Sequence, residues 1–260
     1  MSGVASVLAG AVEGMSPAIV AFCLGAMFIA AFIRGYTGFG SSLLWVPSLS
    51  LVLPPVAVVP VTFMLELAVS LHLLPSIRRD AHWPSLCWIW LGGALGVPVG
   101  LFAMVSLPAD MTRGAVALTV IAAALLLWRG SLLAGTLSWR GTTSVGLVAG
   151  LLTGGVGIPG PPVFLYYLST PLDVRVSRAS IIAYLLGVAP VALLSSYFNG
   201  MLDGKAVLRA ALLLPVVLAG SWLGAHAFGR ADPEKARRWT LLVLMAIGAA
   251  LLLRVVLGAL

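Results

Sequence analysis

Two charged residues adjoin or interrupt apolar runs. One is an arginine and the other a glutamate, and these side chains can bind an anion and carry a proton. Arg34 follows the apolar run Pro17–Ile33, and Glu66 lies near the middle of the run Val56–Ile77. An ionisable group at membrane depth is costly and usually functional. A guanidinium can bind an oxyanion through two parallel hydrogen bonds, and burial favours the protonated form of a carboxyl. We expect Arg34 to bind an anionic substrate and Glu66 to be the candidate for proton coupling.

Both residues also have a structural interpretation. Arg34 would lie at the cytoplasmic surface if its helix crossed the membrane completely, and it would then follow the bias of basic residues toward that side. Glu66 would be a protonated side chain that hydrogen-bonds a neighbouring helix.

Two glycine-rich junctions interrupt the apolar pattern, one at Arg34–Gly40 and one at Thr153–Gly157. Glycine breaks free backbone N–H groups, and a helix that restarts presents a positive dipole end. Ser41 and Ser42 suit the start of such a helix. Two restarted helices that face each other would form an anion site. The expected substrate-binding residues are Arg34, Gly35, Thr37, Gly38, Gly40, Ser41, Ser42, Thr153, Gly154, Gly155 and Gly157. The alternative is close helix packing at small residues, with no ligand.

Catalytic and metal-binding patterns are absent from the sequence. There is no CxxC, HExxH, GxSxG or phosphate-loop lysine motif. Cys23 and Cys87 lie in apolar stretches, where we expect small buried hydrophobic side chains. We therefore expect no enzyme activity, no catalytic residue, no metal site and no cofactor.

Composition indicates a polytopic α-helical membrane protein. Of 260 residues, 61% are hydrophobic and 9% are charged, and the mean hydropathy is +1.11. A soluble domain has roughly 25% charged residues. The net charge of +7 comes from few basic residues placed between apolar runs, so we expect the lipid bilayer as a partner and no nucleic acid.

Ten apolar runs can be placed along the chain. Six are long enough to cross a bilayer core, at Val56–Ile77, Pro84–Leu107, Met111–Trp128, Ser177–Asn199, Ala206–Phe228 and Trp239–Leu257. Four are shorter, at Pro17–Ile33, Ser41–Leu53, Ser144–Gly154 and Ile158–Thr170. The short runs form two pairs joined by the glycine junctions, and each pair either crosses twice or re-enters on the side it left.

The two pairs indicate an internal duplication. Gly40 and Gly157 are 117 positions apart, and Gly96 and Gly100 precede Gly220 and Gly224 by 124 positions. The first repeat covers 1–130 and the second 141–260, each with a broken short pair and three long helices. Basic residues gather in the loops at 78–83 and 229–238, which places those loops in the cytoplasm. If each short pair crosses twice, the odd number of crossings in each half gives the halves opposite orientation, as in many secondary transporters.

These motifs resemble the TauE/SafE family of sulfite and organosulfonate exporters. The matching segments are Arg34–Gly40 with Val46-Pro47, Gly150–Gly157 with Pro161-Pro162, and Asn199–Asp203 before Gly220–Gly224. The segment Gly157–Gly160 departs from the three consecutive glycines common in the family.

The resemblance implies a multi-pass carrier in the bacterial inner membrane that exports small sulfur-containing anions. Protons or another ion would couple the movement, and a homo-oligomer is compatible with the sequence. An anion channel with the same broken helices, a non-transporting membrane subunit and an intramembrane enzyme are the alternatives.

Overall fold

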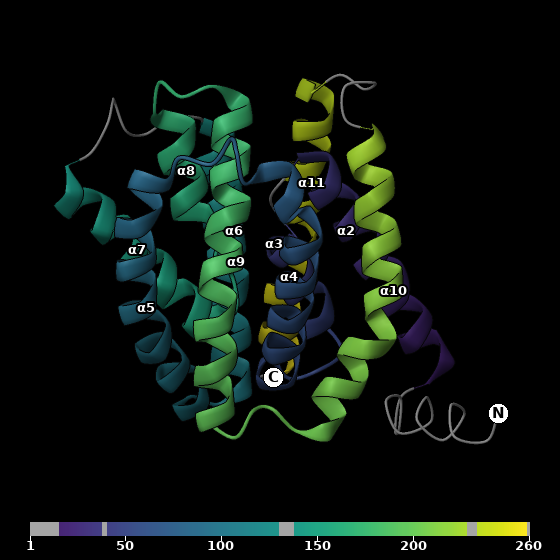
Figure 1. Ribbon diagram of the computed structural model, residues 1–260. Coiled ribbons are helices and arrows are strands. Elements are labelled where there is room, and N and C mark those ends of the chain that lie inside the picture. The colour runs from purple at the N-terminus through teal and green to yellow at the C-terminus, as the bar shows by residue number, and fades with distance from the viewer. Residues whose placement is uncertain (1–15, 38–40, 130–137, 228–232, 259–260) are drawn as a thin grey trace.

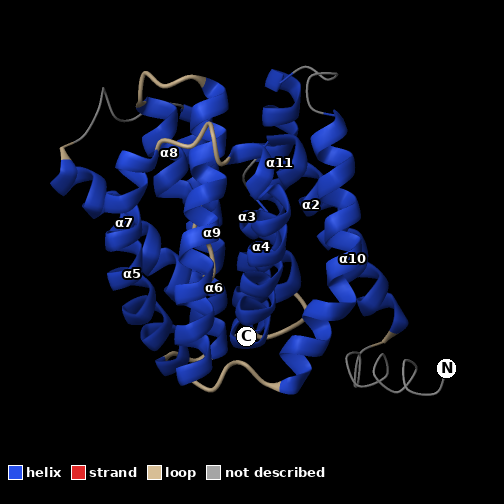
Figure 2. Cartoon of the chain, viewed as in Figure 1, coloured by secondary structure: helices blue, strands red, loops and turns tan. Residues whose placement is uncertain are grey.

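The computed structural model describes residues 16–37, 41–129, 138–227 and 233–258, and the elements within these ranges are all helices (Figures 1 and 2). They are α2 Pro17–Thr37, α3 Ser41–Ser50, α4 Pro55–Ile77, α5 Trp83–Ser106, α6 Ala109–Arg129, α7 Trp139–Val156, α8 Pro161–Ser169, α9 Val174–Phe198, α10 Gly204–Ala227 and α11 Pro233–Gly258. The expected all-helical membrane fold is confirmed.

Six described helices are long and apolar enough to cross a membrane: α2, α4, α5, α6, α9 and α10. This set differs from the predicted one at the start of the chain. The first run extends beyond Ile33 to Thr37, so α2 joins the long helices. Helix α11 spans Pro233–Gly258, and its described side chains include the apolar stretch Leu241–Leu257. The chain is therefore a multi-pass membrane protein, and α2 is a long apolar helix that the sequence pattern had placed among the short runs.

Two short helices complete the broken pairs. Helix α3 has 10 residues and α8 has 9, so each is about 15 Å long or less, roughly half of a bilayer core. Helix α7 ends at Gly157, whose φ of 73° lies in the left-handed region that favours glycine. Helix α8 then begins with Pro161 and Pro162, and these prolines provide no N–H group at that helix start.

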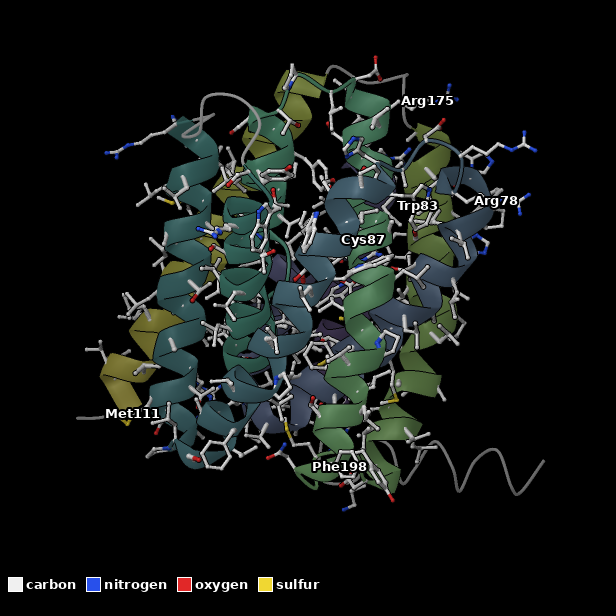
Figure 3. The ribbon with its side chains drawn as sticks, turned by 60° about the vertical axis from the view of Figure 1, so that its left-hand side comes forward. Arg78, Trp83, Cys87, Met111, Arg175 and Phe198 are labelled. Carbon is white, nitrogen blue, oxygen red and sulfur yellow. The ribbon has the colours of Figure 1, made fainter. Side chains whose placement is uncertain are left out.

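Both pairs return to the rim from which they start (Figure 1). The α8–α9 loop lies at the same rim as the α4–α5 loop, since Arg175 in the first turn of α9 pairs with Asp80 of the α4–α5 loop at 3.3 Å. Figure 3 shows Arg78 and Arg175 at that rim, with Met111 and Phe198 at the opposite one. The α7–α8 pair therefore enters from the rim that is predicted to be cytoplasmic, and the α2–α3 pair from the other rim.

Two helix interfaces are unusually close, α2 with α10 and α5 with α7. A Cβ added to Gly35 would clash with the backbone at Ser221 and Ala225, and one added to Gly154 would clash at Val97 and Leu101. Backbone groups meet directly because glycine leaves no side chain between them.

These two interfaces use corresponding residues. Gly154 follows Gly35 by 119 positions, and its neighbours Val97 and Leu101 precede Ser221 and Ala225 by 124 positions. The reciprocal contacts obey the same spacing. Gly224 lies against Phe32 and Tyr36, whereas Gly100 lies against Leu151 and Gly155. The α2–α10 and α7–α5 pairs are thus equivalent in sequence spacing and in atomic contacts.

Gly100→Leu is expected to lower the stability of the protein. Its new side chain would meet the α7 backbone at Leu151 and Gly155, and overpacking of this kind costs about 3 kcal/mol. The measurement is the melting temperature of the detergent-solubilised variant. Gly114→Leu on α6 is the matched control, because nothing lies within 4 Å of a Cβ at Gly114. Equal melting temperatures for the two variants would contradict the close α5–α7 interface.

Candidate substrate and proton site

The centre of the candidate site is a buried ion pair between Arg34 and Glu66. The Arg34 Nη1 group donates to Glu66 Oε2 and to Ser41 Oγ, the latter at 2.8 Å. Its Nη2 group donates to Ser70 Oγ at 2.8 Å. Ser41 in turn donates to the second Glu66 oxygen. Arg34 is 0% exposed and Glu66 is 2% exposed, so the two charges are buried and are hydrogen-bonded to each other and to two hydroxyls.

Three helices position this cluster. Arg34 is in the last turn of α2, Ser41 is the first residue of α3, and Glu66 and Ser70 share one face of α4, one turn apart. Glu66 is the twelfth residue of the 23 in α4. The end of α2 and the start of α3 therefore meet α4 at half of its length.

The cluster leaves one hydrogen-bond donor of Arg34 without an acceptor. Within the described residues, Arg34 Nε is buried without a hydrogen-bond partner. A second guanidinium approaches from α9, where Arg178 Nη2 donates to the Gly35 carbonyl oxygen at 3.1 Å. Two arginines thus converge on the end of α2 beside one carboxylate, an arrangement suited to a small anion.

The second break faces the first hairpin. A Cβ added to Gly157 would lie 2.6 Å from a methyl group of Val59 and 3.2 Å from one of Val46. Thr153, 119 positions after Arg34, is fully buried, and its hydroxyl donates to Ala149 of its own helix at 2.7 Å. The two hairpins therefore meet inside the bundle, with a charged group on one side and a neutral hydroxyl on the other.

The surface interpretation of Arg34 is wrong, because the side chain is fully buried. The partner of Glu66 is Arg34, whereas the sequence predicted separate roles for these two residues. Ser42 is buried near the cluster at the start of α3. The Thr37 side chain, Gly38 and Gly40 lie outside the described residues.

The glycines that were predicted to bind substrate lie in different environments. Gly35 and Gly154 face neighbouring backbone, as the packing interpretation expects, whereas a Cβ on Gly155 would find its nearest neighbour at 3.6 Å. Neither Ser70 nor Arg178 was among the residues predicted from the sequence. Ser70 could have been found from its position four residues after Glu66 in the same helix.

The described residues contain no group of three or more metal-ligating side chains. Cys23 is buried as expected, but the expectation for Cys87 is wrong, since it is exposed on α5 (Figure 3). Its apolar neighbourhood faces the outside of the bundle, where a membrane protein carries apolar side chains.

Comparison with known proteins identifies the family. Residues 23–251 match the family described as sulfite exporter TauE/SafE. The chain belongs to this family. It is 30% identical over 231 residues to the probable sulfite/organosulfonate exporter TauE of Cupriavidus necator, covering 85% of this chain and 89% of that protein. No solved structure matches the chain. The resemblance seen in the glycine motifs is confirmed, and this TauE/SafE protein carries its buried ion pair within the matched region.

Arg34→Met and Glu66→Met are each expected to destabilise the protein, because each leaves one unpaired buried charge. Loss of one partner of a buried pair costs about 3–5 kcal/mol. The double variant removes both charges and should recover most of that loss. The check is a double-mutant cycle on melting temperatures in detergent, with Asp80→Asn at the exposed pair with Arg175 as the control. Additive losses in the double variant would mean that the pair is not coupled.

Proposed function

We propose that this TauE/SafE protein is a secondary transporter that exports small anions, sulfite or organosulfonates, across the bacterial inner membrane. The observation that carries the proposal is the Arg34–Glu66 pair buried at the end of a broken helix. The family match supports export, and the name of the Cupriavidus necator relative supports the substrate class. The family is described by export and not by a reaction, so we propose transport without chemistry on the substrate.

We propose that substrate and proton act on the same ion pair. Glu66 is the anion that Arg34 holds, and an arriving substrate anion competes for the same guanidinium. Protonation of Glu66 removes its charge and weakens its hold on Arg34, so proton binding and anion binding favour each other. Ser41 and Ser70 keep the guanidinium in place while its anionic partner changes from Glu66 to the substrate.

Movement of the two repeats would give both sides access to this site. The equivalent α2–α10 and α7–α5 interfaces support two inverted halves, 1–130 and 141–260, that rock against each other. The membrane potential can contribute to the export of a net negative charge, about 2.3 kcal/mol for each charge moved through 100 mV. A proton bound to Glu66 would reduce the net charge moved by one.

Arg34→Lys is expected to lower the transport rate of alkylsulfonate by at least tenfold in proteoliposomes. Lysine keeps the charge that Glu66 requires but cannot form paired parallel hydrogen bonds to an oxyanion. The assay is saturable uptake of labelled alkylsulfonate and sulfite, with exchange against unlabelled anion to separate a carrier from a channel. Arg113→Lys on α6 is the matched control. Normal rates in folded Arg34→Lys protein would remove Arg34 from the site.

Glu66→Gln is expected to flatten the pH dependence of transport. In the unmodified protein, lower pH protonates Glu66 and frees Arg34, so uptake of a sulfonate whose own charge is constant should rise as pH falls. Glutamine cannot titrate, so uptake by this variant should vary less with pH than uptake by the unmodified protein. An unchanged pH profile in this variant would make Glu66 a structural residue.

A further inference from the structure

The short helix α8 is attached to its neighbours by hydrogen bonds near the rim that is predicted to be cytoplasmic. The Tyr167 hydroxyl of α8 lies 2.8 Å from Ser85 Oγ at the start of α5. Ser85 gives its own hydrogen to the His82 carbonyl oxygen at 3.0 Å, so Tyr167 is the donor in the bond that it shares with Ser85. The Ser177 hydroxyl of α9 donates to the Tyr167 carbonyl oxygen at 3.4 Å. Tyr167 therefore connects α8 to both α5 and α9.

Further bonds join α5 directly to α9 at the same place. The His82 backbone N–H donates to Ser180 Oγ at 2.8 Å, and the Ser180 hydroxyl donates to the Val176 carbonyl oxygen at 2.8 Å. Ser85, Tyr167 and Ser180 are all buried, so water does not replace these bonds while the contact is closed. We call His82, Ser85, Tyr167 and Ser180 the Tyr167 cluster.

The Tyr167 cluster lies between the cytoplasmic rim and the buried ion pair. Figure 3 shows Arg175 of α9 at the rim. One turn deeper, Arg178 donates to the carbonyl oxygen of Gly35 at 3.1 Å, and Gly35 directly follows Arg34 in the chain. Tyr167 contacts this same turn of α9. A direct way from the cytoplasmic rim to Arg34 therefore passes α8 and the start of α9.

Helix α8 can change its position while α7 stays in place. Helix α7 packs on α5 at backbone distance, since a Cβ on Gly154 would clash with the α5 backbone. The chain then turns at Gly157, whose φ is 73°, and a Cβ on Gly160 would meet nothing within 4 Å. Glycines at both ends of the turn 157–160 can absorb a change of backbone angles. The turn is thus a hinge between a fixed long helix and a helix of 9 residues.

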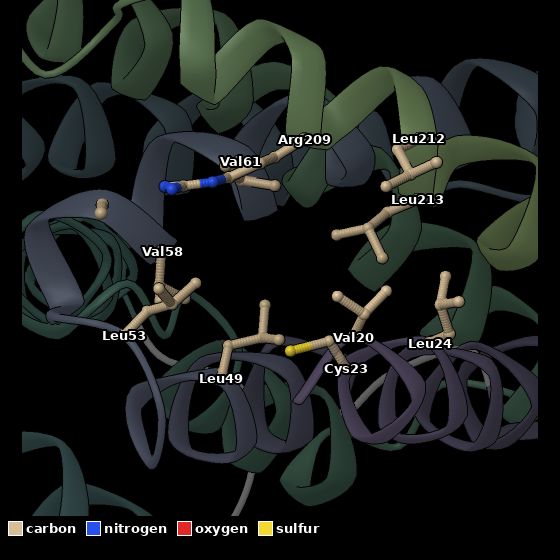
Figure 4. Close-up of a pocket in the computed structure, with 11 residues that line it drawn as sticks. Val20, Cys23, Leu24, Leu49, Leu53, Val58, Val61, Arg209, Leu212 and Leu213 are labelled. Carbon is tan, nitrogen blue, oxygen red and sulfur yellow. The ribbon is translucent and has the colours of Figure 1, made fainter. Parts of the chain in front are cut away.

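The other short helix, α3, has different surroundings at the opposite rim. Its end, together with the first parts of α2, α4 and α10, surrounds a cavity of about 40 Å³ (Figure 4). Apart from Arg209, the lining residues are valines, leucines, one alanine and Cys23. Apolar contacts of this kind are non-directional, whereas the bonds of the Tyr167 cluster are directional and must break before α8 can leave α5. A contact that is either made or broken suits a closure with two defined states.

We propose that α8 is the cytoplasmic gate of the anion site, and that the hydrogen bond from Tyr167 to Ser85 holds it closed. The inference rests on the proposed transport function and assigns the element that opens its site to the cytoplasm. When this bond breaks, α8 turns about the hinge 157–160 and uncovers the face of α9 that carries Arg178. The close α5–α7 contact is kept during this step. The local opening adds to the rocking of the two halves and admits the anion from one side.

A cysteine placed behind the gate tests this proposal without a transport assay. Ile182 is fully buried and follows Arg178 by one turn on the same face of α9. Ile182→Cys is made in a background without the two native cysteines, Cys23→Ser with Cys87→Ser. The membrane-impermeant reagent sulfonatoethyl methanethiosulfonate is added to inside-out vesicles, which present the cytoplasmic rim. Tyr167→Phe is expected to raise the labelling rate about fivefold, because loss of one hydrogen bond shifts the opening equilibrium by roughly that factor.

Matched variants separate gating from general loosening. Ser85→Ala removes the acceptor of the same bond, so it should raise the rate of Ile182→Cys as much, and the double variant should raise it no further. Tyr166→Phe removes the neighbouring hydroxyl, which lies outside the Tyr167 cluster, and keeps the ring contact with Tyr167; it should leave the rate unchanged. Val120→Cys, fully buried on α6, should stay unlabelled in every variant.

Three results would overturn the proposal. They are an unchanged labelling rate in Tyr167→Phe, an equal rise at Val120→Cys, and a rise confined to reagent added from the outer side. Faster cytoplasmic labelling in a protein that moves no anion would refute the transport function and leave α8 assigned as the moving element.

Discussion

The burial of two opposite charges at half the length of α4 is the constraint on which the rest of the structure depends. Hydrocarbon does not solvate a guanidinium, so Arg34 must find an anion and further acceptors inside the protein. Glu66, Ser41 and Ser70 provide them from two other helices. This requirement brings the end of α2, the start of α3 and the middle of α4 to one point. The break between α2 and α3 therefore has its position set by electrostatics as well as by glycine.

The same ion pair makes the site sensitive to a change of charge on either partner. A buried ion pair contributes little net stability, because desolvation of both groups offsets their attraction. It is, however, sensitive to any change in the charge of one partner. A proton on Glu66 or a competing anion at Arg34 changes the electrostatic free energy of the buried pair by much more than the same change would at the protein surface. A paired charge in the centre of the bundle is thus better suited to exchange of ions than to stabilisation of the fold.

Glycine packing supports this centre from both sides. The α2–α10 and α5–α7 contacts hold the two long arms of the broken pairs at backbone distance from their partners. A helix fixed so closely along one side can end within the bundle without losing its position. The halves also differ, since Thr153 in the second half occupies the position that corresponds to Arg34 in the first.

Much of the fold followed from local sequence, and the errors came from contacts between distant residues. Six long apolar runs and two glycine-interrupted pairs were recognisable because apolar length and helix breakers act locally. The helix α2 was predicted to end at Ile33, because a charged residue normally ends an apolar run. It continues to Thr37 because its arginine is neutralised by a residue 32 positions away. Ser70 and Arg178 were not predicted from the sequence, and the reason is similar. Their contacts with Arg34 and Gly35 depend on α2 lying beside α4 and α9.

The sequence by itself determined that this is a helical membrane protein of the TauE/SafE family with two broken helix pairs, because composition, run length and glycine motifs are properties of the linear chain. The tertiary structure decided that Arg34 and Glu66 are partners, that both pairs return to their own rims, and that Cys87 faces outward. It also separated glycines that pack helices from the one at Gly157 that turns the chain. Pairing in three dimensions depends on which helix faces meet, and side chains from separate helices determine those faces together.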